Sequence, residues 1–487
     1  MISFSLSLIA LVLGYFFYSR LLERMMQPDG TRPTPAMAHP DGVDYLPLPG
    51  WKVFMIQFLN IAGTGPIFGA IMGAKFGPSA YLWIVLGCIF AGATHDYLSG
   101  MLSVRHDGAS LPELVGRYLG QKARMGMLVF SVLLLVMVGA VFVYSPALIL
   151  GHICGSTLLW VLAIFAYYVL ATMLPIDKII GKIYPLFALS LLFMAFGLLV
   201  CLYAKMPVLP ELWNGLGNRG AATDPGFTDS IFPALFITIA CGAISGFHAT
   251  QSPLMARCIK NERLGRPIFY GAMITEGMVA MVGATVAMYF FYGEPAAGYT
   301  LLDGAGNKGF QTAAPTVVTL VCNHWLGLAG GILAMLGVVA APITSGDTAF
   351  RSARLILADF LHLPQQPIGK RLLVSVPLFA CAIALLVWQM DNPNGFNVVW
   401  QYFGWANQTL SVITLWTLTV YLAQQGRCYY VTLLPALLMT MVCCTYLLVS
   451  PTAFGLPYGW GLTGGALATL CALAAFVQWL RKLWRRL

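Results

Sequence analysis

The amino-acid sequence predicts an all-α polytopic membrane protein whose core is a pair of inverted five-helix repeats. Of its 487 residues, 59% are hydrophobic and 9% are charged, whereas a soluble domain has about 25% charged residues. The apolar runs are continuous and have the length of roughly 20 residues that spans a bilayer as a helix. Basic residues gather in alternate loops, and two of the apolar runs are interrupted by glycine in the same manner. A soluble fold is therefore excluded.

Thirteen apolar runs are predicted to be membrane spans. In order, they lie at 2–22, 53–73, 80–103, 125–149, 157–174, 182–203, 231–250, 268–292, 313–341, 372–390, 397–421, 429–450 and 459–480. The first run lacks a basic segment before it, so we expect an anchored span and not a cleaved signal peptide. The longest loops, at 24–52, 203–230 and 293–312, are rich in Gly, Pro and Asn and are expected to be structured caps.

The distribution of Lys and Arg supports this span order. All but four of the 27 basic residues fall in every second loop, and the exceptions are Lys75, Lys205, Arg219 and Lys308. Because an excess of Lys and Arg marks cytoplasmic loops, we predict an outside N-terminus and a cytoplasmic tail with Arg481, Lys482, Arg485 and Arg486. The net charge of +9 is explained by topology, so no nucleic-acid partner is expected.

The second and seventh runs are broken by small residues, at Asn60–Pro66 and at 239–248. Unwound backbone within a membrane is tolerated only where protein or a wet cavity surrounds it. Matched broken spans in two halves of a chain point to a transporter binding site. Four runs separate the two breaks, so each repeat has five helices and the second is inverted. The predicted parts are 1–52, the first repeat 53–203, the loop 204–230, the second repeat 231–421 and the C-terminal part 422–487.

At the first break, Gly63 and Gly65 flank Thr64, and Pro66 follows. Proline is tolerated at the start of a helix, and the exposed N–H groups there suit an anion such as a carboxylate. The alternative is close helix packing, because Gly65, Gly69, Gly73 and Gly77 recur at every fourth position. We favour packing for the last three and a binding role for Asn60, Gly63, Thr64 and Gly65.

At the second break, the candidate residues are Gly242, Ser245, Gly246 and His248. The alternative is an ordinary kinked helix whose histidine is bonded to a neighbouring carbonyl. A histidine within a span can bind substrate, carry protons or simply be satisfied by hydrogen bonds.

The ninth run is predicted to end in a segment that contains Thr344, Ser345 and Asp347. The two hydroxyls, together with carbonyls freed at the first break, suit an oxygen cage for sodium. Asp347 either joins such a cage, carries a proton, or forms an i,i+4 ion pair with Arg351.

Other polar residues within predicted spans are His95, Asp96, Glu276, Asn407 and Gln408. Intramembrane ionisable groups mark pathways or relays by default, so His95 and Asp96 are candidates for coupling ions or protons. Glu276 has no partner that the sequence identifies. A metalloenzyme motif such as HExxH is absent, and the eleven cysteines contain no CxxC pair. No cofactor and no metal beyond sodium are therefore expected.

Several of these segments resemble the carbon starvation protein A (CstA) family. They are Asn60–Gly69, Ala91–Asp96, Arg105–Leu111, Phe236–His248, Thr344–Arg351 and Trp400–Gln408. The resemblance implies membership of the amino acid–polyamine–organocation transporters, with a five-plus-five, LeuT-like core, and uptake of peptides or, in some members, of pyruvate with protons. Two stretches depart from the family pattern: Ile56-Gln57 stands where members have a histidine pair, and Thr250–Leu254 replaces a Ser/Gly/Thr-rich stretch.

The predicted function is ion-coupled uptake of a small carboxylate, such as pyruvate, or of short peptides, across the inner membrane by alternating access. The chain would interact with its small-molecule substrate and with lipid. Asn407 and Gln408 join the residues of the two breaks as candidates for substrate binding. The alternatives are a channel and an intramembrane enzyme that uses His95, Asp96 and His248.

Overall fold

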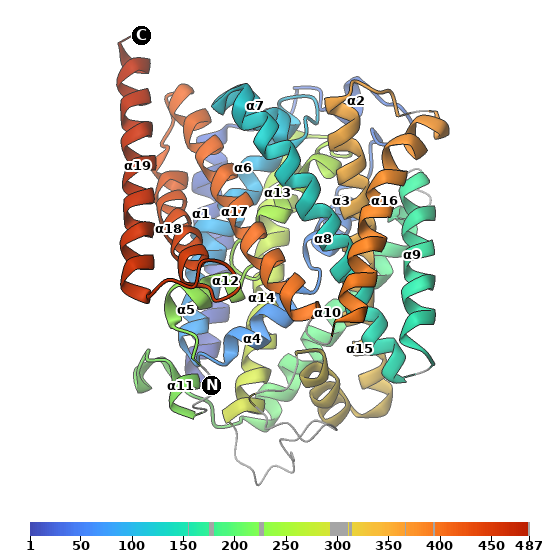
Figure 1. Ribbon diagram of the computed structural model, residues 1–487, viewed down its shortest axis with the longest axis vertical. Coiled ribbons are helices and arrows are strands. Elements are labelled where there is room, and N and C mark those ends of the chain that lie inside the picture. The colour runs from blue at the N-terminus through green and yellow to red at the C-terminus, as the bar shows by residue number, and fades with distance from the viewer. Residues whose placement is uncertain are drawn as a thin grey trace.

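The computed structural model describes residues 1–153, 155–174, 180–223, 228–292, 310, 314–365, 367–392 and 395–485. All regular secondary structure in these ranges is helical, as predicted. Figure 1 shows a bundle of long helices with the N- and C-terminal ends of the chain at opposite ends of the molecule. This placement agrees with an odd number of membrane crossings.

The α-helices can be followed in Figure 1 by their labels. They are α1 (Ile2–Met26), α2 (Pro35–Ala38), α3 (Gly50–Ile61), α4 (Ala70–Ala74), α5 (Ser79–Leu86), α6 (Ala93–Val104), α7 (Leu111–Leu119), α8 (Gln121–Ile153), α9 (Thr157–Met173), α10 (Ile180–Lys205), α11 (Arg219–Thr223), α12 (Phe236–Thr238), α13 (Gly246–Ala256), α14 (Gly271–Tyr292), α15 (Ala314–Phe360), α16 (Ile368–Asp391), α17 (Gly395–Gln424), α18 (Tyr430–Val449) and α19 (Tyr458–Trp484). Segments of π-helix lie at Gly65–Gly69, Gly87–Gly92, Ile231–Leu235 and Arg266–Tyr270.

Within the described ranges, nine helical segments are long and apolar enough to cross a membrane. They are Ile2–Met26, Ser79–Val104, Gln121–Gly151, Tyr184–Lys205, Glu262–Tyr292, Gly330–Phe360, Ile368–Asp391, Tyr430–Val449 and Tyr458–Trp484. The pair Gly50–Ile61 and Gly65–Ala74 adds a tenth crossing if it is one span, and it is bent by 54°. α9 is a shorter apolar helix. The count of thirteen stays a prediction.

The predicted ninth span is wrong in its boundaries. The sequence places it at 313–341, but α15 changes direction at Gly327 (φ 66°, ψ −175°), a conformation that glycine adopts without a steric penalty. The apolar segment long enough to cross begins at Gly330 and continues to Phe360, because Pro342 does not end the helix. Arg351 and Arg354, expected in a cytoplasmic loop, are buried within this helix.

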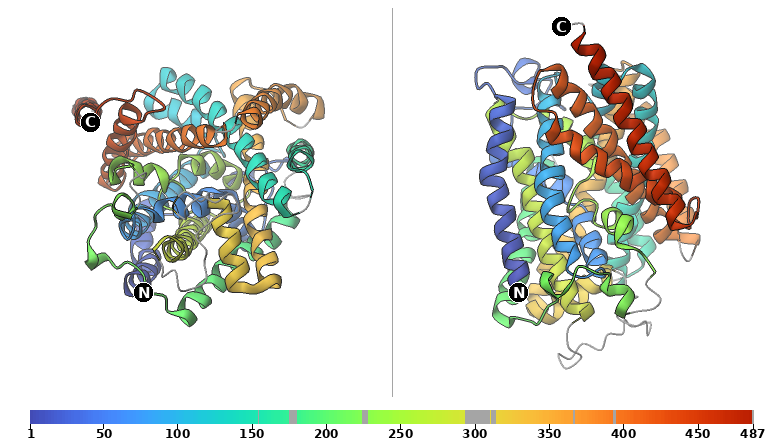
Figure 2. Two further views of the ribbon diagram at one scale, coloured as in Figure 1. Left: turned by 60° about the horizontal axis from the view of Figure 1, so that its bottom comes forward. Right: turned by 90° about the vertical axis from the view of Figure 1, so that its left-hand side faces the viewer.

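The centre of the bundle is formed by α6 and α13, in which every residue is buried. α13 packs on α6, α17 and α3, while α14 packs on α3 and α4. α15 contacts both α8 and α10. Figure 2 shows α19, the helix nearest the C-terminus, at the edge of the bundle. The polar residues of α6 and α13 therefore face other protein groups.

The loop cap predicted at 24–52 is present, since segment 27–49 folds over the helix ends with α2 within it. The loop predicted at 293–312 lies outside the described residues, apart from residue 310. Lys308 and Arg486, used in the charge count, also lie outside them.

Candidate functional site

Both predicted breaks are present. α3 ends at Ile61, and helical structure resumes with Gly65. α12 ends at Thr238, and α13 begins at Gly246. Proline at the second position of the resumed helix fits, because its missing N–H would have no helical partner there.

The two breaks contact each other, although about 180 positions separate them. A methyl group added at Gly69 would lie 2.6 Å from the carbonyl oxygen of Thr238, and one at Gly65 would overlap the side chain of Cys241. The missing side chains therefore let the two backbones approach closely. One face of the first broken span thus packs directly against the second break.

The packing role predicted for glycines after the first break is confirmed for Gly69 and Gly73. The latter faces the side chain of Ile239. Gly77 has a different role, because its φ of 84° places it in the left-handed region after α4, beside Arg219. Gly63 faces α8 and α15, since an added methyl would lie 2.8 Å from the ring of Phe142.

Side chains from α17 and α5 satisfy the backbone of the second break. The Asn407 Oδ1 atom accepts from the Ser245 hydroxyl (3.0 Å) and from the N–H of Phe247 (2.7 Å), which caps the start of α13. Gln408 donates to the carbonyl of Phe236 at 3.1 Å, and Trp83 donates to that of Ile239 at 3.1 Å. The structure therefore brings the predicted Asn407 and Gln408 to the second break.

Three polar side chains of the first broken span have no hydrogen-bond partner within the described protein. They are Gln57, Asn60 and Thr64, which are buried; Gln57 and Asn60 lie one helical turn apart on α3, and Thr64 lies within the break. Both amide atoms of Gln57 and of Asn60 are unpaired. Buried polar groups of folded proteins are otherwise almost always paired. These side chains are therefore available to a bound molecule or to water.

Four ionisable side chains meet in the centre of the bundle. Asp96 on α6 lies 2.8 Å from Nδ1 of its neighbour His95 and 2.8 Å from Nδ1 of His248 on α13. The Nε2 atom of His248 is 3.5 Å from Oε2 of Glu276 on α14. All four side chains have a relative exposure of 0%. The structure thus gives Glu276 the partner that the sequence does not identify.

The hydroxyl and carboxylate residues of α15 form a separate polar region. Ser345 donates to the carbonyl of Leu59, close to the first break, at 3.0 Å. Thr344 instead donates to carbonyls of its own helix, at Ala340 and Ala341. Of the two hydroxyls predicted to lie with carbonyls of the first broken span, only that of Ser345 contacts one.

Asp347 does not pair with Arg351 among the described ion pairs. Its Oδ2 atom accepts from Tyr184 at 2.8 Å and from Tyr167 at 3.2 Å. Arg351 points instead to Asp44, 3.4 Å away. The i,i+4 ion pair weighed from the sequence is therefore wrong, because the guanidinium finds a carboxylate on the loop cap and the carboxylate finds hydroxyls on α9 and α10.

A vestibule of about 810 Å³ leads to the second break. Ile237 and Thr238 line it, as do the aromatic side chains of Trp400 and Tyr446. Lys75 and Asp229 contribute one charge of each sign.

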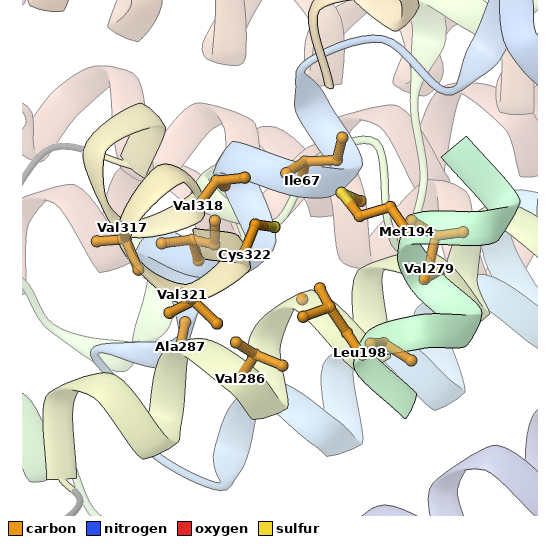
Figure 3. A pocket seen from close by; sticks show the side chains of 14 residues that line it. Ile67, Met194, Leu198, Val279, Val286, Ala287, Val317, Val318, Val321 and Cys322 are labelled. Carbon is orange, nitrogen blue, oxygen red and sulfur yellow. The ribbon is translucent and has the colours of Figure 1, made fainter. Parts of the chain in front are cut away.

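A second, much smaller cavity of about 30 Å³ lies beside the helix that follows the first break. Figure 3 shows the apolar side chains around it, among them Ile67, Met194, Val321 and Cys322. Its labelled lining offers carbon and sulfur atoms only, so it does not suit a polar substrate.

The opposite side of the molecule from the vestibule loops is held together by buried ion pairs of the loop cap. Asp44 is 2% exposed and lies 3.4 Å from both Arg351 and Arg354. Burial alone raises the pKa of Asp44, but Arg354 and Arg351 outweigh it and hold the pKa of this carboxyl below its usual value. The N–H groups of Leu46 and Leu48 donate to main-chain carbonyls after α13.

A second buried acidic residue is also paired with two arginines. Glu262 is buried and lies 3.0 Å from Arg32 and 3.3 Å from Arg105. The loop cap is thus fixed at two places on the ends of the helices that carry the candidate site.

The sequence did not single out Gln57, Tyr167, Tyr184 or Asp44 as functional candidates. Gln57 lies in one of the two stretches that depart from the family pattern, and this departure could have identified it as a candidate. For the tyrosines no local signal exists, because their carboxylate partner is more than 160 positions away.

Comparisons with known proteins decide the family. The model of the family described as carbon starvation protein CstA matches residues 1–150, 146–301 and 300–446. This chain belongs to the CstA family. An uncharacterized membrane protein of Haemophilus influenzae is 45% identical over 340 residues, which are 60% of this chain and 91% of that protein.

Other relatives of the CstA-family chain carry functional names. The peptide transporter CstA of Campylobacter jejuni is 27% identical and covers 87% of this chain and 76% of its own length. The pyruvate/proton symporter BtsT of Escherichia coli is 27% identical, with 90% of this chain and 79% of that protein covered. The chain is therefore a multi-pass membrane transporter.

Several solved structures have a fold similar to that of this chain. A Na⁺-coupled sialic acid symporter has a TM-score of 0.55 at 13% identity and covers 96% of this chain and 95% of that chain. A manganese transporter of Eremococcus coleocola has a TM-score of 0.54 at 11% identity, with 92% and 99% covered.

Proposed function

We propose that this CstA-family chain is a secondary active symporter that takes up a small carboxylate such as pyruvate, or short peptides, by alternating access. The observation that carries the proposal is the contact between the two breaks, where Gly65 and Gly69 meet Cys241 and Thr238. Freed backbone groups from two broken spans then surround one place in the centre of the bundle. The named relatives transport peptides or pyruvate, which supports this substrate class.

The substrate lies beside the two breaks in this proposal. The helix that resumes at Gly65 presents free N–H groups, which suit a carboxylate, and the unpaired amides of Gln57 and Asn60 supply further polar contacts. The other candidates for substrate binding in this proposal are the break residues Gly63, Thr64, Gly242, Ser245 and Gly246, with Asn407 and Gln408 beside the second break. Carboxylates and the backbone of a peptide both match such a set of donors and acceptors.

We propose thirteen spans and two inverted repeats at 53–203 and 231–421, flanked by 1–52, the loop 204–230 and the part 422–487. The broken spans are then the first helices of their repeats. Alternating access would move one group of helices against the other around the breaks, and the chain would lie in the cytoplasmic membrane of a bacterium.

The vestibule supports an outward-open state with the N-terminus outside and the C-terminus in the cytoplasm. Its lining includes Lys75, Asp229 and Ser450–Thr452, which belong to three loops with few basic residues. The basic loops lie where the cap is fastened by Asp44 and Glu262. Lys75 and Asp229 give the vestibule one charge of each sign, which suits a substrate with a carboxylate or with both peptide termini.

The polar residues near the breaks support coupling to sodium or protons. Thr344, Ser345 and Asp347 form one candidate region, and His95 and Asp96 belong to the other. A proton/pyruvate relative and a Na⁺-coupled neighbour in fold are both known.

Uptake into liposomes that contain the purified protein tests the function. We expect radiolabelled pyruvate or alanyl-alanine to enter with saturable kinetics and to show counterflow. Linear, non-saturating flux without counterflow would indicate a channel. Failure to transport any small carboxylate or dipeptide would contradict the proposed substrate class.

A further inference from the structure

We propose that His95, Asp96, His248 and Glu276 form the proton-binding site of this transporter, and that the coupled proton is held between His248 and Glu276. This inference rests on the proposed function and names its coupling ion. The four side chains come from α6, α13 and α14 and are fully buried. Ionisable groups in such a place are costly to keep charged and are typical of proton relays.

The hydrogen bonds of Asp96 fix where protons already lie. An ionised carboxylate only accepts hydrogen bonds, so the Nδ1 atoms of His95 and His248, each 2.8 Å away, are the donors. In a neutral imidazole the other nitrogen, Nε2, is then an acceptor. An additional proton on either histidine must therefore bind at Nε2, and neither Nε2 atom has a hydrogen-bond partner.

Glu276 decides which Nε2 atom receives the proton. Its Oε2 lies 3.5 Å from Nε2 of His248, and neither carboxyl oxygen has a hydrogen-bond partner. Without a proton between them, two acceptors face each other in a buried environment. One proton on either atom turns this contact into a charge-assisted or neutral hydrogen bond. The distance exceeds the usual hydrogen-bond length, so a small shift of α13 towards α14 closes it.

The charge of the cluster requires such a proton. With both carboxyl groups ionised and both histidines neutral, the cluster would carry two buried negative charges. In the described part of the chain, the ion pairs of Asp96 and Glu276 involve these histidines and no Lys or Arg. The other titratable groups that face the cluster are the thiols of Cys88 and Cys241, which add no positive charge.

The proton site shares its helices with the second break. His248 is the third residue of α13, whose first turn is fixed by Asn407. Gly277 follows Glu276 on α14, and a methyl added there would lie 3.7 Å from the carbonyl oxygen of Gly242 in the break. Closing or opening the His248–Glu276 contact therefore moves one wall of the proposed substrate site. This connection is the physical basis of coupling.

Asp347 lacks the corresponding arrangement. Two tyrosine hydroxyls donate to its Oδ2 atom, its Oδ1 atom has no partner, and no histidine contacts it among the described hydrogen bonds and ion pairs. It has no neighbouring imidazole to which a proton can pass.

Infrared difference spectroscopy of the purified protein tests proton binding without any substrate. Between acidic and alkaline pH we expect either a carboxylic-acid C=O band or an imidazolium ring band that disappears in Glu276→Gln. Thr285→Val is the matched control, since Thr285 is buried on the same helix and its hydroxyl donates to the carbonyl of Met281 and not to the cluster. Carboxylic-acid and imidazolium bands that are both unchanged in Glu276→Gln would overturn the proposal.

Transport in liposomes gives the second measurement. With an inward proton gradient, wild type and Thr285→Val should accumulate pyruvate or alanyl-alanine, whereas Glu276→Gln and His248→Gln should lose accumulation but retain counterflow. Gradient-driven accumulation by Glu276→Gln would overturn the coupling role. If the wild type transports neither probe, the proposed substrate class fails, and the infrared bands alone decide whether a proton is held between His248 and Glu276.

Discussion

Ser345 on α15 donates a hydrogen bond to the main-chain carbonyl of Leu59 on α3, 3.0 Å away. This bond joins a long, buried helix directly to the segment that unwinds at the first break. The carbonyl of Leu59 therefore has a hydrogen-bond donor from the protein without a cation.

We predict that replacing sodium by potassium leaves uptake unchanged, because the Ser345 hydroxyl occupies the carbonyl of Leu59 and Thr344 is turned towards its own helix. The measurement is initial uptake into liposomes in the two media at constant pH. Stimulation by sodium that disappears in Ser345→Ala but persists in Thr344→Ala would contradict this prediction and place sodium at Ser345.

Gln57→Ala and Asn60→Ala should weaken substrate binding while changing the free energy of unfolding by less than about 1 kcal/mol, since these buried amides lose no protein partner. Thermal-shift titrations with pyruvate and alanyl-alanine would measure both effects.

Asn407→Ala is the matched comparison. Its amide caps α13, so its loss should lower stability by about 1–2 kcal/mol even without substrate. Equal stability losses in Asn60→Ala and Asn407→Ala would show that Asn60 has a structural partner.

Gly73→Ala should impair uptake and lower stability by about 1–3 kcal/mol through overpacking, because the added methyl overlaps the side chain of Ile239. Ile239→Ala should restore uptake in the double variant, since the Cβ atom of Ile239 would be 3.7 Å from the new methyl. Gly126→Ala, where nothing lies within 4 Å, is the control. Absence of rescue would mean that contact between the two breaks is not what limits transport.

Asp44→Asn should lower the melting temperature at neutral pH, because it leaves Arg351 and Arg354 buried without a counter-charge, at a cost of about 3–5 kcal/mol. Since the pKa of Asp44 is lowered by folding, its stabilising effect is complete above the usual Asp pKa of about 3.9 and is lost as the pH falls through the lower folded pKa.

The difference in melting temperature between wild type and Asp44→Asn should therefore shrink only in strong acid. Asp391→Asn, at an exposed position, should show no such difference at any pH. A difference that already vanishes in mildly acidic buffer would contradict the ion-pair assignment.

The sequence predicted those features of the site that depend on local backbone chemistry. Gly63-Thr64-Gly65-Pro66 and the glycines of 242–246 cannot continue a regular helix without cost, so both breaks were visible. The position of α15 was missed because Pro342 resembles a helix end, although the helix tolerates it. Its true change of direction depends on the single backbone conformation of Gly327.

The pairing of side chains could not be predicted in the same way. Asp96 and His248 are 152 positions apart, and nothing local to either residue indicates the other. Asp347 had a cation one helical turn away in Arg351, yet the loop cap supplies Asp44 to that cation. Which of two available partners an ionisable group takes is decided by tertiary packing, and a single sequence does not contain that information in readable form.

The small cavity beside Ile67 has a mechanical consequence. Protein interiors are packed to crystal-like density, so a half-helix enclosed on all sides could pivot only by displacing whole neighbours. The free volume of about 30 Å³ is lined by flexible apolar groups such as Met194, and it gives the helix after the first break space into which its side chains can rotate. Filling that space should make the transporter stiffer, and hydrostatic pressure, which favours states with less void volume, should shift its conformational equilibrium.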